Sequence, residues 1–173
     1  HVMAVDPESL AVVYYPAPVL QKAEPIEAVD DEVRAVAARM IELMYEHEGI
    51  GLAAPQVGLA WRMFVIRESE EDGLPDMVFI NPKLSGLRGE MKPFEEGCLS
   101  LPGITAQVRR PVSVKIEATG LDGEPISLES DQFIARVWQH EFDHIDGVLI
   151  LDRMSKLDRI ALRKQIKALE SRG

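Results

Sequence analysis

The chain contains 173 residues, of which 46% are hydrophobic and 28% are charged, a composition typical of one soluble globular domain. No apolar run approaches the roughly 18 residues that span a bilayer. The net charge of −10 argues against general binding to DNA or other nucleic acids. We therefore expect a single domain over residues 3–173, with neither DNA nor a membrane as partner; His1 and Val2, before Met3, resemble a cloning remnant.

The first predicted element is a helix that begins at Asp30 or Asp31, either of which can cap its N-terminus. Its apolar residues recur at helical spacing as far as Met44, and Gly49 suits the position just past its C-terminus. Strand-like segments follow, with an acidic loop after the first and an Asp-Gly turn before the last. They cover residues 63–67, 77–80, 112–118 and 126–128.

Two more helices are predicted over residues 131–145 and 156–171. Helices at both ends with strands between them indicate an α+β fold. From Arg153 onwards the chain has seven Lys or Arg residues against two Asp or Glu residues, a local charge of +5. A basic tail on an acidic body suggests a specific anionic contact, and a solvated helix face is the alternative.

The strongest chemical signal is a His-Glu-x-x-His run inside the predicted helix 131–145. His140 and His144 are four residues apart, so both imidazoles can reach one metal ion, and Glu141 is close enough to take a proton from a metal-bound water. A catalytic metal needs a third protein ligand. Glu170 is one candidate, and Cys98 is the better one because a thiolate with two imidazoles suits zinc or ferrous iron.

Two other segments are candidates for contact with a substrate. The glycine-rich run from Gly49 to Gln56 follows a helix, and Pro55 would interrupt a helix there, which argues against a dinucleotide-binding turn. Such a loop instead lets backbone approach a substrate, with Gln56 donating an amide hydrogen bond. Phe133 and Val137 continue the histidine stripe and could form the wall of an apolar pocket, with ordinary core packing as the alternative.

Taken together, residues 49–56, 96–100 and 139–147 resemble the three signature motifs of the peptide deformylase family, in the same order. The segment from Tyr14 to Lys22 is also similar to that family's N-terminal segment, and the helical C-terminus is similar to the bacterial type. The resemblance implies an α+β fold in which mixed or antiparallel sheets pack around a central metal-binding helix.

The resemblance also implies a reaction. The enzyme would hydrolyse the N-formyl group of the formyl-methionine that begins newly made polypeptides and would release formate. Cys98, His140 and His144 would hold one divalent metal, typically Fe²⁺ with Zn²⁺, Ni²⁺ or Co²⁺ tolerated. A metal-bound water would attack the formyl carbon, with Glu141 as general base and then general acid.

Further roles follow from the same resemblance. The Gln56 side chain and the Leu99 backbone N–H would stabilise the developing oxyanion. The methionine pocket and the peptide contacts would come from Ile50, Gly51, Phe133 and Val137. Many relatives carry arginine about where Thr105 stands, so this difference concerns substrate-backbone contacts and peptide preference rather than metal chemistry. The basic terminal helix would contact ribosomal RNA, as in some relatives.

Two other functions compete with this one. A metallopeptidase with the same His-Glu-x-x-His motif would cut internal peptide bonds and use a third ligand other than Cys98. A structural metal site in a binding module would close all four positions with protein ligands, and the sequence offers only three obvious ones. The single cysteine and the lack of a basic-then-apolar leader predict a cytoplasmic location.

Overall fold

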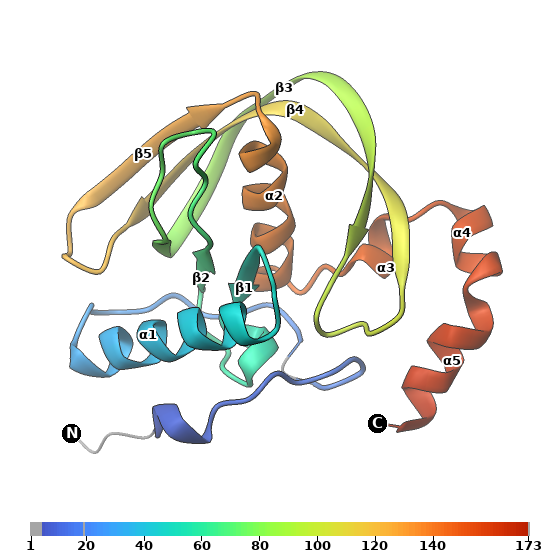
Figure 1. Cartoon of the computed structure of the whole chain (residues 1–173), viewed down its shortest axis with the longest axis horizontal. Coiled ribbons are helices and arrows are strands. Elements are labelled where there is room, and N and C mark those ends of the chain that lie inside the picture. The colour runs from blue at the N-terminus through green and yellow to red at the C-terminus, as the bar shows by residue number, and fades with distance from the viewer. Residues whose placement is uncertain (1–4, 19, 173) are drawn as a thin grey trace.

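The computed structural model describes residues 5–18 and 20–172, so the predicted cloning remnant lies outside the described part. The α+β fold expected from the sequence is present: one antiparallel sheet, in which each strand pairs with the next along the chain, curves around a central helix, and the other helices lie outside it (Figure 1). No helix in these residues is long and apolar enough to cross a bilayer. In chain order the elements are η1 (Pro7–Ser9), α1 (Asp31–Glu46), β1 (Gly51–Ala53), η2 (Ala54–Val57), β2 (Met63–Ile66), β3 (Met77–Gly97), β4 (Thr105–Thr119), β5 (Pro125–Ser130), α2 (Phe133–Ile145), α3 (Ile150–Arg153), α4 (Lys156–Ala161) and α5 (Arg163–Arg172).

Helix α1 begins where the sequence predicts. The Asp30 carboxylate accepts a hydrogen bond from the Val33 N–H at 2.9 Å and so caps the N-terminus. The end of the helix differs from the prediction, because the left-handed residue after the cap is Glu48 (φ 56°) and not Gly49. Gly49 instead packs close to Leu99: a Cβ there would lie 3.3 Å from the Leu99 Cδ1, so that side chain would have to shift by a few tenths of an ångström.

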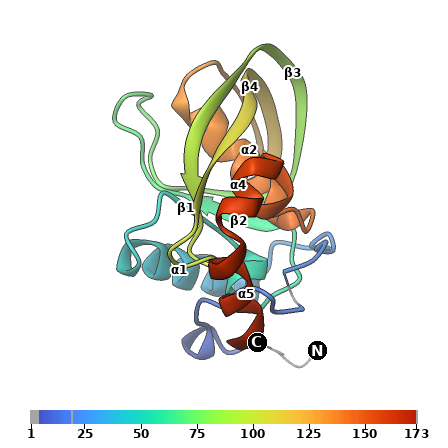
Figure 2. The same ribbon diagram turned by 90° about the vertical axis from the view of Figure 1, so that its right-hand side faces the viewer.

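Strands β3 and β4 extend well beyond the segments predicted for them. After Ile80 the side chains of β3 are mostly exposed, so no apolar alternation marks this part of the strand. Three register shifts between Ile80 and Met91 interrupt the β3–β4 ladder. Such bulges bend a strand pair, and the two strands arch over α2 (Figures 1 and 2). The arch brings the end of β3, with Glu96, down onto that helix.

Helix α2 lies in the middle of the molecule (Figure 1). It begins at Phe133, two residues later than predicted, and most of its side chains are buried. Trp138 packs against Phe79 of β3, with ring centroids 6.5 Å apart, inside a cluster that also includes residues of β2 and β4. The sheet therefore fixes both the position and the rotation of the helix that carries the two histidines.

The predicted helix 156–171 is two helices, α4 and α5, which are separated at Leu162, and the short helix α3 before them was not predicted. Ile166 and Leu169 of α5 are buried in a cluster with Leu101 and Val108 from the β3–β4 hairpin region. The Tyr15 hydroxyl donates to the Glu170 carboxylate at 2.9 Å. The basic tail is therefore packed against the body of the protein.

Met40→Ala tests the packing of α1. Met40 is fully buried among residues of α1, β1 and β2, so truncation leaves a cavity that is expected to cost about 2–5 kcal/mol of unfolding free energy. Glu46→Ala, at an exposed position of the same helix, is the control and should change stability by less than about 0.5 kcal/mol. Denaturant titration followed by circular dichroism measures both, and equal midpoints would contradict the packing described.

Candidate metal centre

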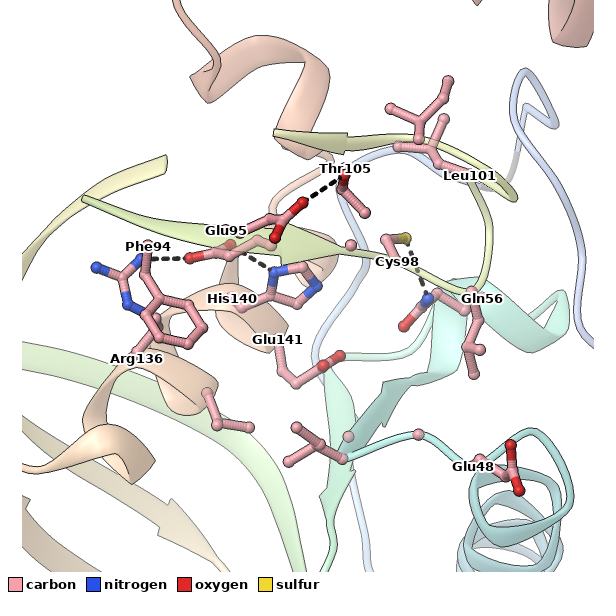
Figure 3. Close-up of a pocket in the computed structure, with 18 of the residues that line it drawn as sticks. Glu48, Gln56, Phe94, Glu95, Cys98, Leu101, Thr105, Arg136, His140 and Glu141 are labelled. Carbon is pink, nitrogen blue, oxygen red and sulfur yellow. Dashed lines mark hydrogen bonds and ion pairs between the residues drawn. The ribbon is translucent and has the colours of Figure 1, made fainter. Parts of the chain in front are cut away.

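A group of three potential metal ligands lies where the end of β3 meets α2: Cys98, His140 and His144. The two histidines come from α2, and Cys98 stands in the turn that follows β3. Figure 3 shows His140 and Cys98 at the edge of the same cavity. One ligand atom from each of the three residues lies within 4.8 Å of the other two. The Nε2 atoms of His140 and His144 are 3.2 Å apart, and the His144 Nε2 is 3.6 Å from the Cys98 Sγ.

These distances fit a tetrahedral metal ion. Nitrogen ligands bound at about 2.0–2.1 Å and a thiolate at about 2.3 Å stand roughly 3.3–3.6 Å apart at tetrahedral angles. Within the described residues no fourth His, Cys, Asp or Glu joins the cluster. Three protein ligands leave one position for water or substrate, which is the pattern of a catalytic metal and not of a closed structural site. Glu170, the alternative third ligand, is bonded to Tyr15 instead.

A buried carboxylate, Glu96, orients the first histidine. Its Oε1 lies 2.8 Å from the His140 Nδ1, so the Nδ1–H donates to Glu96 and the Nε2 is left to bind metal. Arg110 donates two hydrogen bonds to the same carboxylate at 2.8 and 2.9 Å, and Arg136 donates another. Burial opposes the charge of Glu96, but these hydrogen bonds from His140 and Arg110 hold its pKa well below the usual value.

Arg110 also links helix α2 to the sheet. Arg110 of β4 also donates to Asp143 of α2 at 2.8 Å, and Arg153 of α3 completes the pairing of Asp143 with two bonds at 3.0 and 2.8 Å. The sequence analysis missed this network. The available signal was that Glu96 and Asp143 lie inside the two ligand-bearing motifs.

Glu141 stands beside the ligands in a state suited to proton transfer. Its side chain is buried and its Oε1 has no hydrogen-bond partner in the described structure. Burial raises the pKa of Glu141 to about 7, close to the value at which a carboxylate exchanges protons well at neutral pH. Burial also lowers the pKa of His144 well below its ordinary value, which favours the neutral imidazole that binds metal.

Strand β1 covers Glu141 at Gly51. A Cβ at position 51 would come 2.8 Å from the Glu141 Oε2 and 2.9 Å from its Cγ. Such contacts are shorter than a Cβ tolerates, so only glycine lets the strand pass over this carboxylate without moving it.

Gln56 points its amide donor into the site. Its Oε1 accepts from the Ala53 N–H at 2.9 Å, which fixes the orientation of the amide. The Nε2 therefore faces the Cys98 Sγ at 3.6 Å (Figure 3). It also lies 3.4 Å from the Ser100 Oγ. Among the described residues the adjacent Leu99 N–H has no hydrogen-bond acceptor.

A cavity of about 430 Å³ opens beside these groups. The residues expected to contact substrate all line it: Ile50, Gly51, Phe133 and Val137. Val137 is buried, whereas Ile50 and Phe133 are about half exposed at the rim. Thr105 lies at the edge of the same cavity, where its hydroxyl donates to Glu95 at 2.8 Å.

Comparison with known proteins identifies the family. The polypeptide deformylase family model matches residues 9–160. The chain belongs to the peptide deformylase family. It is 45% identical over 161 residues to a peptide deformylase of Acinetobacter baumannii, an alignment that covers 92% of this chain and 91% of that one. It is 41% identical over 165 residues to peptide deformylase 1B, chloroplastic/mitochondrial, of Arabidopsis thaliana, which covers 94% of this chain and 60% of that protein.

Solved structures agree. A plant peptide deformylase superposes with a TM-score of 0.90 at 40% identity, covering 99% of this chain and 94% of that one. The Thermotoga maritima enzyme superposes with a TM-score of 0.78 at 39% identity, covering 90% and 99%. This deformylase is therefore a metallohydrolase with a Cys98, His140 and His144 metal site, and its substrates are formylated nascent peptides. The metallopeptidase and binding-module alternatives are set aside.

Gly51→Ala tests the contact between β1 and Glu141. The added methyl group must displace the Glu141 carboxylate, and a shift of about 1 Å in a catalytic group can reduce turnover about 10²-fold. Metal content should not change, because the three heavy atoms nearest to the added Cβ all belong to Glu141 and not to a metal ligand. Gly120→Ala is the control, since its nearest neighbour is the Asp122 carboxylate, remote from the site. Formate release and metal analysis measure both; full activity in Gly51→Ala would refute the contact.

Proposed function

We propose that Cys98, His140 and His144 hold ferrous iron in the working enzyme, and that zinc, nickel or cobalt can replace it. The cluster of one thiolate and two imidazoles, beside a buried carboxylate that has no hydrogen-bond partner among the described residues, supports a divalent metal at this place. The choice of ferrous iron rests on membership of the deformylase family. When bound, the divalent ion supplies Lewis-acid chemistry, which polarises the formyl oxygen and acidifies a water molecule. Glu96 and Arg110 keep the imidazole of His140 aimed at the ion.

Glu141 moves the proton. Its unpaired carboxylate takes a proton from the attacking water as a C–O bond forms to the formyl carbon. The same group returns the proton to the amine nitrogen as the C–N bond breaks, so the products are formate and a free N-terminus. A pKa near 7, which burial causes, suits both transfers.

Gln56 and Leu99 stabilise the oxygen on which negative charge develops. The Gln56 Nε2 is held toward the site by the bond from Ala53, and the Leu99 N–H is free to donate among the described residues. Donors fixed before the reaction need no reorganisation, and removing one such donor from a serine protease costs about 2.7–4 kcal/mol.

The apolar cavity receives the first side chain of the substrate. Ile50, Phe133 and Val137 supply apolar walls next to Glu141, the right place for the methionine that follows the formyl group. The backbone at Gly51 can pair with the extended peptide in the manner of an added strand. We further propose that residues 3–173 act as one catalytic domain, because the cavity combines residues from β1 through α2.

Glu141→Gln tests the proton-transfer role. The amide cannot accept a proton, so formate release from a short formyl-methionyl peptide should fall about 10²–10⁴-fold while bound metal stays constant. Glu90→Gln, at an exposed position of β3 outside the cavity, should keep full activity. Loss of metal together with activity would instead assign Glu141 a structural role.

We also propose that the basic tail contacts the ribosome and that the enzyme works in the cytoplasm of a bacterium or in an organelle. The relatives named above are bacterial or chloroplastic/mitochondrial. All seven basic side chains from Arg153 to Arg172 are exposed, although α5 itself is packed on the body through Ile166 and Leu169. The exposed charges therefore face outward on a fixed scaffold.

A triple Arg163→Gln, Lys164→Gln, Lys167→Gln variant tests this contact without exposing the buried face of α5. Affinity for ribosomes should fall, and the slope of log K against log salt should drop by about 2–3, since each lost phosphate contact removes a little under one unit. Formate release from a short peptide should not change. Lys83→Gln on β3 is the control, and an unchanged salt slope in the triple variant would exclude the contact.

A further inference from the structure

Two neighbouring cavities share part of their lining. The cavity that contains the metal ligands has a volume of about 430 Å³, and the second has a volume of about 270 Å³. Three residues line both: Phe94 of β3, and Phe133 and Arg136 of α2. Figure 3 shows Arg136 and Phe94 together at the end of the site that is farthest from Cys98 and Gln56.

Contacts on three sides hold the Arg136 side chain in this shared wall. Its guanidinium donates to the Glu96 carboxylate, to the Val108 carbonyl at 3.0 Å and to the Lys92 carbonyl. Only 11% of the side chain is exposed. Moving it aside would break bonds to a buried carboxylate and leave two carbonyls without a donor, so an entering apolar group cannot readily displace it.

The two aromatic rings complete the wall. The guanidinium carbon of Arg136 lies 5.5 Å from the centre of the Phe94 ring, a cation–π arrangement. Phe94 and Phe133 meet with centroids 5.2 Å apart and planes inclined by 59°. Phe94 and Phe133 each remain nearly half exposed. The wall is thus a fixed side chain braced by two rings, with empty volume behind it.

We infer that Arg136, braced by Phe94, forms the end wall of the first-side-chain pocket and sets the longest unbranched side chain that the enzyme accepts. The inference rests on the proposed assignment of that pocket to the first residue of the substrate. It assigns Arg136 a part in specificity, which the sequence analysis did not foresee. Without the wall the two cavities join, and a longer chain can extend into the second.

The test uses two N-formyl tripeptides with the same last two residues. One begins with norleucine, whose butyl chain has the length of methionine, and the other with 2-aminodecanoic acid, whose chain is four carbons longer. The wild-type enzyme should prefer the shorter substrate by at least about tenfold in kcat/KM, because a rigid pocket rejects even small additions. In Arg136→Ala this preference should fall about tenfold.

The preference ratio separates specificity from general damage. Arg136→Ala also removes one donor from Glu96, which would slow both substrates alike and leave the ratio unchanged. Phe94→Ala opens the same wall while the Arg136–Glu96 pair remains, and it should lower the ratio in the same direction. Arg109→Ala is the matched control: this exposed arginine of β4 bonds the Met91 carbonyl and lines neither cavity.

An unchanged ratio in both Arg136→Ala and Phe94→Ala would overturn the inference, as would a wild-type enzyme that accepts both substrates equally. The proposed assignment of this cavity to the first side chain of the substrate has its own test. Equal kcat/KM for formyl-alanyl and formyl-norleucyl peptides in the wild type would show that the first side chain does not enter the cavity.

Discussion

The structure of the site depends on one buried carboxylate. Glu96 accepts hydrogen bonds from Arg110, Arg136 and the metal ligand His140, which join β3, β4 and α2 at a single point. Burying charges costs hydration, and a buried ion pair often contributes little net stability even when complete. Removing one partner, however, typically costs about 3–5 kcal/mol because it leaves a charge uncompensated. The network therefore enforces one geometry around the imidazole more than it stabilises the fold.

That constraint explains the unusual length of β3 and β4. A shorter hairpin would complete the sheet, but it would not bring Glu96 and the following Cys98 onto α2. The bulges between Ile80 and Met91 bend the exposed part of the hairpin, so its end returns to the helix (Figure 1). Packing of Trp138 and its neighbours against the sheet fixes the other half of the centre. The ligands are thus placed by rigid elements on both sides.

Much of this arrangement could be predicted from the sequence, because local patterns carry it. Three features can be recognised from residues within one or two helical turns of one another: the cap at Asp30, the apolar periodicity of α1 and the His-Glu-x-x-His spacing. The extended part of β3 could not be predicted, since exposed side chains on both faces give no alternation. The left-handed Glu48 and the Arg110 network were also missed: Arg110 lies 33 residues from Asp143, and only the fold brings them together.

The same burial that builds the centre also gives it its chemistry. The Glu141 Oε1 has no hydrogen-bond partner among the described residues, and burial raises the pKa of this carboxylate toward neutrality. Glu96, equally buried, is kept ionised by three donors. The pKa values of Glu96 and Glu141, two glutamates near His140, are therefore shifted in opposite directions. One is a permanent anion that aims a ligand, and the other is a carboxylate that can take and return a proton. A glycine at position 51 preserves this difference, because any larger residue would press on the carboxylate that must remain unpaired.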